Sequence, residues 1–156
     1  MKRNLIIAGA AVLLIGYLIW RAQPEQVLKR RCDLLISMAD SVAGGTGFFD
    51  LNRLEGLLAD RVAVEVEQVS TERERFGQVE VITGYQWLGE NVQKSSFDII
   101  EFTSIDIQDD KATVKTRVEG MLEMPDIRMM DGEYFVEFQW KKDERDEWRL
   151  VALIWK

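Results

Sequence analysis

The chain contains no histidine, a single cysteine and only two prolines among its 156 residues. The missing histidine excludes Ser–His–Asp and Cys–His nucleophilic sites, and it excludes zinc sites built on imidazole. The single thiol, Cys32, cannot form an intrachain disulfide or a thiolate zinc site. Because Cys32 falls in a helical apolar pattern, we interpret it as a small core residue rather than a nucleophile. We expect no metal and no cofactor.

Positive charge is also scarce in this sequence. The net charge is −7, and Lys2, Arg3 and Arg21 flank an apolar run, so the other residues together carry −10. Such a surface repels phosphate backbones, and no basic stripe with interleaved aromatic residues offsets it. We therefore exclude nucleic acid as a partner.

The apolar run Leu5–Trp20 holds 16 residues without a charge, nine of which are Leu, Ile or Val. At ~1.5 Å per residue this helix would span roughly 24 Å, slightly less than a hydrocarbon core of ~30 Å. A cleaved signal peptide is the rival interpretation, but no small-x-small cleavage site follows Trp20. We predict a signal anchor or transmembrane helix over residues 1–23, with the membrane as partner through residues 5–20.

Basic residues stand on both sides of this run, so two orientations are open. Lys2 and Arg3 favour an inside N-terminus, whereas Arg21 and the basic residues at 29–31 favour the opposite. We favour export of the domain. The chain is then a single-pass protein of the inner (cytoplasmic) membrane with a periplasmic, extracytoplasmic domain.

Residues 24–156 predict one α+β domain. Apolar residues at helical spacing predict helices from Pro24 to Val42, from Asp50 to Leu58 and over 77–92. The glycine-rich segment 43–47 lacks the Gly-Lys-Ser/Thr ending of a phosphate-binding loop, so we interpret it as a helix–helix turn.

Alternating apolar residues predict the strands. A short strand covers 62–66, residues 71–75 form a charged connector, and a strand-rich meander fills the last sixty residues. In its first strand one face is predicted to hold Phe97, Ile99, Glu101, Thr103, Ile105 and Ile107. A long connection over 123–132 and a charged loop over 143–146 separate the later strands.

The predicted order of elements is distinctive. It consists of three helices with a short strand after the second, followed by an antiparallel meander near the C-terminus. The meander ends in an aromatic strand, a charged hairpin and a strand that begins with Trp-Arg. The residues that carry it are 57–62, 77–80, 135–143 and 147–151. Over residues 25–156 the chain resembles the nuclear-transport-factor-2-like superfamily, which includes ketosteroid isomerase and scytalone dehydratase. The resemblance implies three helices packed on a curved antiparallel sheet, a cystatin-like cone, which would follow the transmembrane helix predicted from the apolar run.

The resemblance also implies a pocket at the open end of the cone. Our candidates for lining it are Tyr85, Trp87, Asp98, Tyr134 and Trp140. A proton shuttle would draw on Asp40, Asp98, Glu101, Glu119 and Glu137, together with the two tyrosines. No residue falls in a family motif, so the catalytic residues stay unassigned, and solvated surface carboxylates are the alternative. Trp140 and Trp148 also fit a core role in which the indole N–H reaches a backbone acceptor.

Two classes of function remain. The favoured one is a membrane-tethered, non-catalytic binding or assembly module that forms a homodimer or binds an envelope protein. The alternative is a small lyase, isomerase or carrier that uses the cone pocket for an apolar ligand. A deep cavity with a buried carboxylate would favour the enzyme. A filled cone would favour the module.

Overall fold

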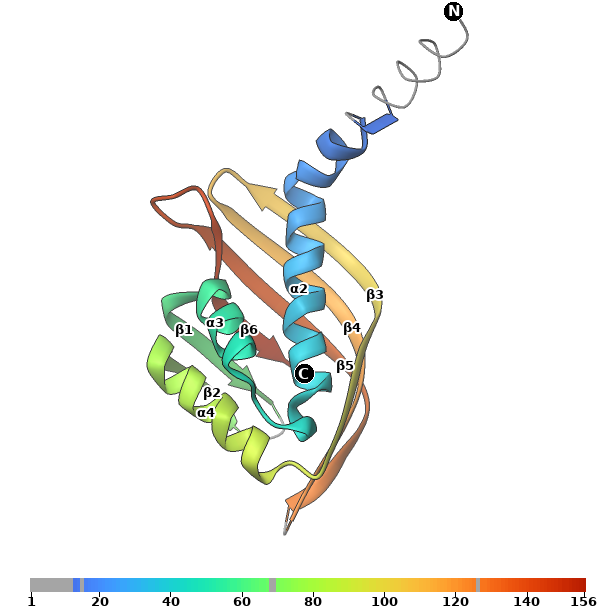
Figure 1. Ribbon diagram of the computed structural model, residues 1–156, viewed down its shortest axis with the longest axis vertical. Coiled ribbons are helices and arrows are strands. Elements are labelled where there is room, and N and C mark those ends of the chain that lie inside the picture. Colours follow the sequence, from blue (N-terminus) through green and yellow to red (C-terminus); the bar gives the residue numbers. More distant parts are fainter. Residues whose placement is uncertain (1–12, 15, 68–69, 126) are drawn as a thin grey trace, which may run out of the picture.

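The structure, a computed structural model, describes residues 13–14, 16–67, 70–125 and 127–156. Helices pack on one side of a six-stranded sheet (Figure 1), which confirms the α+β class. The helices are α2 (Pro24–Asp40), the 3-10 helix η1 (Val42–Gly44), α3 (Phe48–Leu57) and α4 (Gln78–Asn91). The strands are β1 (Leu58–Val66), β2 (Ser70–Gly77), β3 (Lys94–Gln108), β4 (Lys111–Met124), β5 (Ile127–Lys142) and β6 (Trp148–Trp155).

The sheet is mixed, which corrects the prediction of an antiparallel sheet. Its strand order is β2-β1-β6-β5-β4-β3, and β1 runs parallel to β6 while every other neighbouring pair is antiparallel. The chain leaves β1 through β2, α4 and three further strands before β6 returns beside β1. Local alternation along one strand carries no information about such a distant neighbour.

Two predicted connections turn out to be strands. Residues 71–75 lie in β2, an edge strand that pairs with β1. Their alternating charges hide the strand from an apolar pattern, although charged residues are common on sheet edges. Most of the predicted connection 123–132 belongs to β4 and β5, whose pairing continues through Gly120 and Gly132 to the turn. The predicted connection includes Pro125 and Gly132, and both residue types are weak strand signals, so the predicted strands were too short.

The predicted face of β3 is also wrong in part. The β3–β4 pairing shifts between Ile99 and Glu101 and again between Phe102 and Ser104. Each bulge adds a residue and changes the face on which later side chains stand. Consequently Phe102 packs against the core, while Glu101, Thr103 and Ile107 are exposed. After the second bulge Ile105 lies against the core with Phe97 and Ile99, as predicted.

Both later helices begin after a glycine and are closed by an acidic residue in their first turn. The Gly47 N–H donates to Asp50 Oδ2 at 3.4 Å, and the Gly77 N–H donates to Glu80 Oε2 at 2.6 Å. Helix α3 thus starts at Phe48, two residues before the predicted cap. The carboxylates satisfy backbone donors that the helix leaves open.

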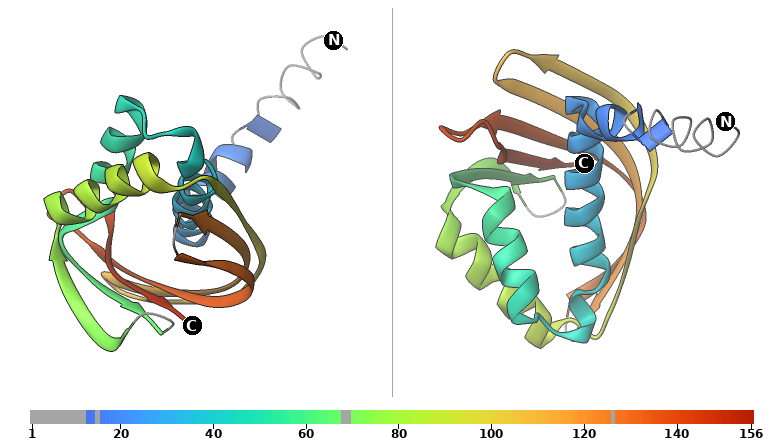
Figure 2. Two further views of the ribbon diagram at one scale, coloured as in Figure 1. Left: turned by 90° about the horizontal axis from the view of Figure 1, so that it is seen from below. Right: turned by 45° about the horizontal axis from the view of Figure 1, so that its top comes forward.

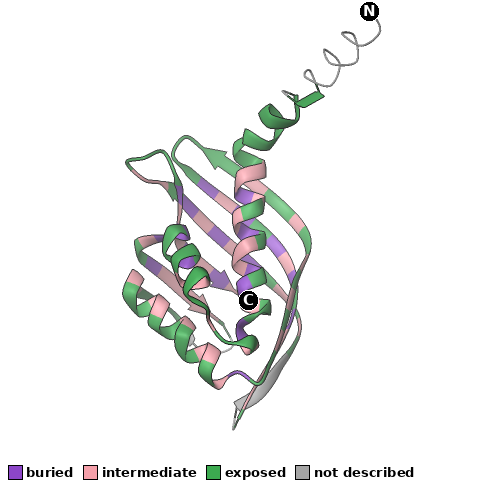
Figure 3. Cartoon of the chain, viewed as in Figure 1, coloured by how far each residue is buried: buried purple, intermediate pink, exposed green. Residues whose placement is uncertain are grey.

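The sheet curls around α2, and α3 and α4 lie next to each other across the remaining opening (Figure 2). Leu28, Cys32 and Ile36 form the buried stripe of α2, as its spacing predicted. They share one core with Phe138 and Trp140 of β5. Buried residues occur along the strands of the sheet and on α2 and α3, whereas none lies in α4 (Figure 3). The cone is therefore filled along most of its length.

The segment before α2 is helical and exposed. Leu13, Leu14, Leu18, Ile19 and Trp20 all stand clear of the domain. Among the described residues, none of the helices combines the length and hydropathy needed to span a bilayer. Much of the predicted anchor over residues 5–20 lies outside the described residues.

The close approach of Phe97 to Gly120 allows the packing on the concave side of the sheet to be tested. A Cβ added to Gly120 would lie 2.5 Å from the Phe97 ring, and that ring packs edge-on against Trp155 at 5.8 Å. Gly120→Ala should lower the free energy of unfolding by about 1–3 kcal/mol because the core is overpacked. Gly84→Ala, where a Cβ in α4 meets open space, should instead raise it by roughly 0.5–1 kcal/mol. Urea unfolding of the full chain in a nonionic detergent measures both, and equal effects would contradict the packing.

Candidate functional site

A small apolar hollow remains near the end of the cone that lies away from the N-terminal helix. Its volume is about 160 Å³. Residues of α2, η1, α3, α4, β3 and β4 line it, namely Leu35, Met38, Ala39, Val42, Leu54, Tyr85, Leu88, Phe97 and Leu122. Small-molecule sites usually measure ~300–1,000 Å³, whereas a cavity of ~150 Å³ holds benzene. The hollow is too small for a steroid-sized ligand.

Among the five predicted pocket residues, only Tyr85 lines the hollow. Its hydroxyl donates to the carbonyl oxygen of Met38 at 3.1 Å and thereby ties α4 to α2. Burial raises the pKa of Tyr85, and the nearby Asp50 carboxylate raises it further. The phenol is therefore a neutral structural donor rather than an acid poised at neutral pH.

The other four predicted residues lie elsewhere. Trp87 of α4 is 49% exposed, and it lines neither this hollow nor the outer clefts between α3 and the β5–β6 hairpin and between α2 and α3. Asp98 is exposed on β3, and Tyr134 packs against Trp155 with ring centroids 5.4 Å apart. Trp140 is a core residue. Among the described residues its indole N–H meets no backbone acceptor, contrary to the expected partner, and it lies toward the Cys32 thiol.

The remaining carboxylates proposed for proton transfer face solvent or bind neighbouring groups. Asp40 Oδ1 accepts from the Phe97 N–H at 2.9 Å, and Glu119 is exposed. Glu101 pairs with Arg117 at 3.5 Å, and Glu137 pairs with Lys115 at 3.9 Å. No carboxylate lines the hollow, and among the described residues the only buried polar side chain is Thr116. Among the described residues, therefore, no buried carboxylate lies inside the cone.

Two further titratable groups lie on α2. Cys32 is fully buried, and burial raises the pKa of its thiol, so the core interpretation is confirmed. Asp33 lies toward β3. Partial burial raises the pKa of Asp33, Asp98 raises it further and Lys29 opposes the change. Neither group reaches the hollow.

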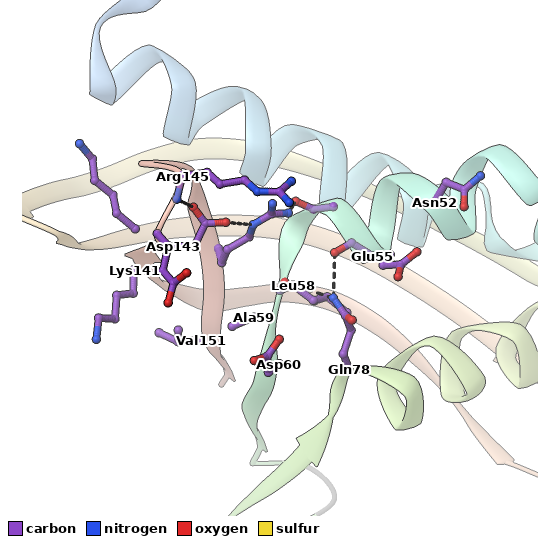
Figure 4. Close-up of a pocket in the computed structure, with 14 residues that line it drawn as sticks. Asn52, Glu55, Leu58, Ala59, Asp60, Gln78, Lys141, Asp143, Arg145 and Val151 are labelled. Atoms are coloured by element: carbon purple, nitrogen blue, oxygen red, sulfur yellow. Dashed lines mark hydrogen bonds and ion pairs between the residues drawn. The ribbon is translucent and has the colours of Figure 1, made fainter.

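A larger open cleft of about 830 Å³ lies on the outside, between α3 and the β5–β6 hairpin (Figure 4). The first residues of β1 and the start of α4 complete it. Its charged and amide-bearing lining residues are Asn52, Glu55, Asp60, Gln78, Lys141, Lys142, Asp143, Glu144, Arg145 and Arg149. None of these was among the predicted candidates. The charged hairpin over 143–146 was the only sequence signal for this site.

Arg149 and Gln78 hold the cleft together. The Arg149 guanidinium binds Asp143 at 2.9 Å and Glu147 at 2.6 Å, and it donates to the Gly56 carbonyl at the end of α3. The Gln78 amide donates to the carbonyl oxygens of Glu55 at 3.0 Å and Leu58 at 3.4 Å. Arg149 and Gln78 are thus bonded to other residues that line the cleft or lie next to it.

Asp143 is a carboxylate of the cleft that several hydrogen bonds hold in place. It accepts from the backbone N–H groups of Arg145 at 2.8 Å and Glu147 at 3.0 Å. The Glu147 backbone bond and then the Arg149 side chain lower the pKa of Asp143 to about 2. A carboxylate held in its charged form is a poor proton donor or acceptor. In the described part of the chain, moreover, no group of three metal-binding side chains gathers.

The architecture matches solved structures at low sequence identity. A nuclear-transport-factor-2-like superfamily protein from Salmonella enterica superposes with a TM-score of 0.66 at 13% identity, covering 84% of this chain and 88% of its own. A second protein of this kind, from Cytophaga hutchinsonii, gives 0.63 at 18% identity, covering 86% and 97%. The chain has the nuclear-transport-factor-2-like fold.

Neighbours with this fold carry diverse provisional names. A Streptomyces avermitilis protein named as a dehydratase of the nuclear-transport-factor-2-like family gives a TM-score of 0.63 at 11% identity, covering 83% of this chain and 92% of its own. No protein-family model matches the chain, and no curated protein matches it. At such identities the likeness concerns the fold, and function has to be argued from sites.

The ion pair between Asp143 and Arg149 predicts a pH response of the β5–β6 hairpin. Since the pKa of Asp143 in the folded state is about 2 and the ordinary value is 3.8, the stabilisation is complete above about pH 4. It is lost as the pH falls through about 2. An NMR titration of the Asp143 carboxyl should give a pKa near 2, and Arg149→Gln should raise it. A titration at the ordinary value in the unaltered chain would contradict the hydrogen-bond geometry.

Proposed function

We propose that this chain is a membrane-tethered, non-catalytic binding module whose domain stands on the periplasmic side of the inner membrane and associates with a second copy. The main observation that supports a non-catalytic role is the filled cone. Its remaining hollow of about 160 Å³ is lined by apolar groups and one tyrosine, and none of the lining residues is a carboxylate. An isomerase or lyase needs a positioned base, and a carrier needs more room for its ligand.

The tether is supported by the residues before α2. Leu13, Leu14, Leu18 and Ile19 are exposed on a helix that the domain does not cover. They belong to an uncharged run that ends at Trp20-Arg21, a pair suited to the membrane interface. Burial in lipid would remove this apolar surface from water.

Self-association is supported by the outer face of the sheet around Phe135. Phe135 is 64% exposed on β5, opposite Arg117 of β4. Arg117 lies 3.5 Å from Glu101 and 3.8 Å from Glu133, so both signs of charge surround the aromatic ring. In a two-fold interface each patch meets its own copy, and mixed charges make such a patch complementary to itself. An exposed aromatic ring at the centre suits an interface core.

One structural neighbour supports assembly rather than catalysis. A protein from Exiguobacterium sibiricum, provisionally named as a calmodulin-dependent kinase association domain, gives a TM-score of 0.64 at 11% identity. Coverage is 86% of this chain and 93% of the neighbour. The fold therefore occurs in a protein named for association.

The tether is tested by charge in the apolar helix. Leu13→Arg/Leu14→Arg should disfavour insertion by about 6–8 kcal/mol, because each Arg costs ~3 kcal/mol near the centre and each Leu contributes ~0.5 kcal/mol. The unaltered chain and the control Leu13→Ile/Leu14→Ile should remain in the pellet when bacterial membranes are washed with alkaline carbonate. The double arginine variant should move to the supernatant. Release of the unaltered chain would contradict the tether.

The dimer is tested by comparing two exposed phenylalanines. Phe135→Glu should turn a dimer into a monomer, because it places like charges face to face across the two-fold axis. Phe49→Glu, at the 78% exposed Phe49 of α3, makes the same chemical change away from this face and should leave the dimer intact. Light scattering on the full chain in dodecyl maltoside gives the mass of each protein complex. A monomeric unaltered chain, or a dimer that survives Phe135→Glu, would reject this interface.

A further inference from the structure

A separate cleft of about 370 Å³ lies between α2 and α3. Its apolar wall consists of Val27, Leu34 and Leu57, and its cationic groups are Arg30, Arg31 and Arg53. Positions 27, 30, 31 and 34 follow the spacing of one helical face, so α2 presents a single stripe of arginine and aliphatic side chains to this cleft. Arginine beside aliphatic carbon matches the two parts of an anionic amphiphile.

The charges of Arg30 and Arg53 are not neutralised by a carboxylate. In the described part of the chain neither forms a salt bridge, although the chain as a whole carries −7. Arg30 donates to the carbonyl oxygens of Gln26, at 3.1 Å, and Arg21. Exposed arginines without a carboxylate partner can donate to a phosphate with two parallel N–H groups.

Arg31 also lines the cleft, and its guanidinium is bound to β6. It donates to the Trp148 carbonyl at 2.7 Å, and Asp143 and Glu147 partly offset its charge. Burial lowers the pKa of Arg31, and the neighbouring Arg149 guanidinium lowers it further. An anion near this group would relieve the repulsion between the two guanidinium ions.

The acidic residues of the first half of α2 point away from the cleft. Glu25 pairs with Lys29 at 2.8 Å, and the Lys29 ammonium lies 5.7 Å from the centre of the Phe102 ring on β3. Asp33 lies toward Asp98, also on β3. Helix α2 thus separates its charges, with carboxylates toward β3 and arginines toward α3.

The cleft lies close to the exposed apolar helix. The Arg30 side chain reaches back to the Arg21 carbonyl, directly after Trp20. In Figure 1 the N-terminal helix leads into the same end of α2, and the turns of the β3–β4 and β5–β6 hairpins lie at this end. Those turns carry Asp109, Asp110 and the acidic residues of 143–146. These acidic turns repel an anionic surface. An anion can therefore bind at this end of the domain only through a local arginine site.

We propose that the α2–α3 cleft binds the headgroup of an anionic phospholipid. The phosphate lies between Arg30 and Arg53, and the glycerol and first acyl carbons lie against Val27, Leu34 and Leu57. This inference rests on the proposed tether, because a bilayer places headgroups next to the segment that follows Trp20. The bound headgroup fixes the height and tilt of the domain above the lipid.

Binding is measured on the full chain in dodecyl maltoside by calorimetric titration with three probes. They are dihexanoyl-phosphatidylglycerol, dihexanoyl-phosphatidylcholine and inorganic phosphate. The phosphatidylglycerol should bind saturably and at least about tenfold more tightly than either of the others, because it offers both the net negative charge and the acyl carbons. If phosphatidylcholine binds equally well, the cleft does not recognise net negative charge, and the proposal fails. If inorganic phosphate binds equally well, the assignment of the ligand to a lipid fails.

Variants locate the site. Arg53→Gln removes a side chain that makes no salt bridge with the described residues, and it should weaken phosphatidylglycerol binding about tenfold. Arg30→Gln/Arg53→Gln should weaken it further. The control Arg61→Gln/Arg75→Gln makes the same change in net charge at exposed positions of β1 and β2 and should leave the affinity unchanged.

Circular dichroism confirms that each variant is folded. An unchanged affinity in the double variant at 30 and 53, or an equal loss in the control, would reject the cleft as the site. Carbonate extraction of the same proteins reports the tether separately, so a failure of headgroup binding is distinct from a failure of anchoring.

Discussion

The structure depends on the packing of α2 inside the curled sheet. Leu28 and Cys32 are completely buried and share a core with Phe138 and Trp140, whose rings stack 6.5 Å apart. Close packing of this kind leaves no room for a ligand along most of the cone. The helix that fills the cone therefore limits the volume inside it, and in the described part of the chain a hollow remains at the far end near Tyr85.

The same packing determines where charge is placed. One face of α2 must be apolar to fill the cone, so its charged residues are confined to the two flanks, toward β3 and toward α3. Helix α4 has no buried residue and is tied to α2 through the Tyr85 hydroxyl and Met38. Polar chemistry is consequently found on the outside of the cone, in clefts between elements.

Sequence reasoning found the elements that have one buried and one solvated face. The α2 stripe and the alternation of β4 from Ala112 to Val118 were predicted correctly, because each has a regular apolar period. It failed at β2, whose edge position needs no apolar face, and at β3, where two bulges change the face. The cleft around Arg149 was missed because it depends on contacts such as that with Gly56, 93 residues away in sequence. No local period encodes such a contact.

Two arginines that contact residues far away in the sequence also fix the direction of the N-terminal helix. Arg31 of α2 holds the Trp148 carbonyl at 2.7 Å, and Arg149 holds the Gly56 carbonyl at the end of α3. Together they join α2, α3 and the β5–β6 hairpin into one unit, so α2 cannot tilt without breaking buried or charge-assisted bonds. Under the proposed tether, the turns of the β3–β4 and β5–β6 hairpins then face the bilayer, and the C-terminal end of α4 points away from it (Figure 1). The outer sheet face around Phe135 stays accessible to a second copy in the same membrane, because it lies on the convex side, away from α2.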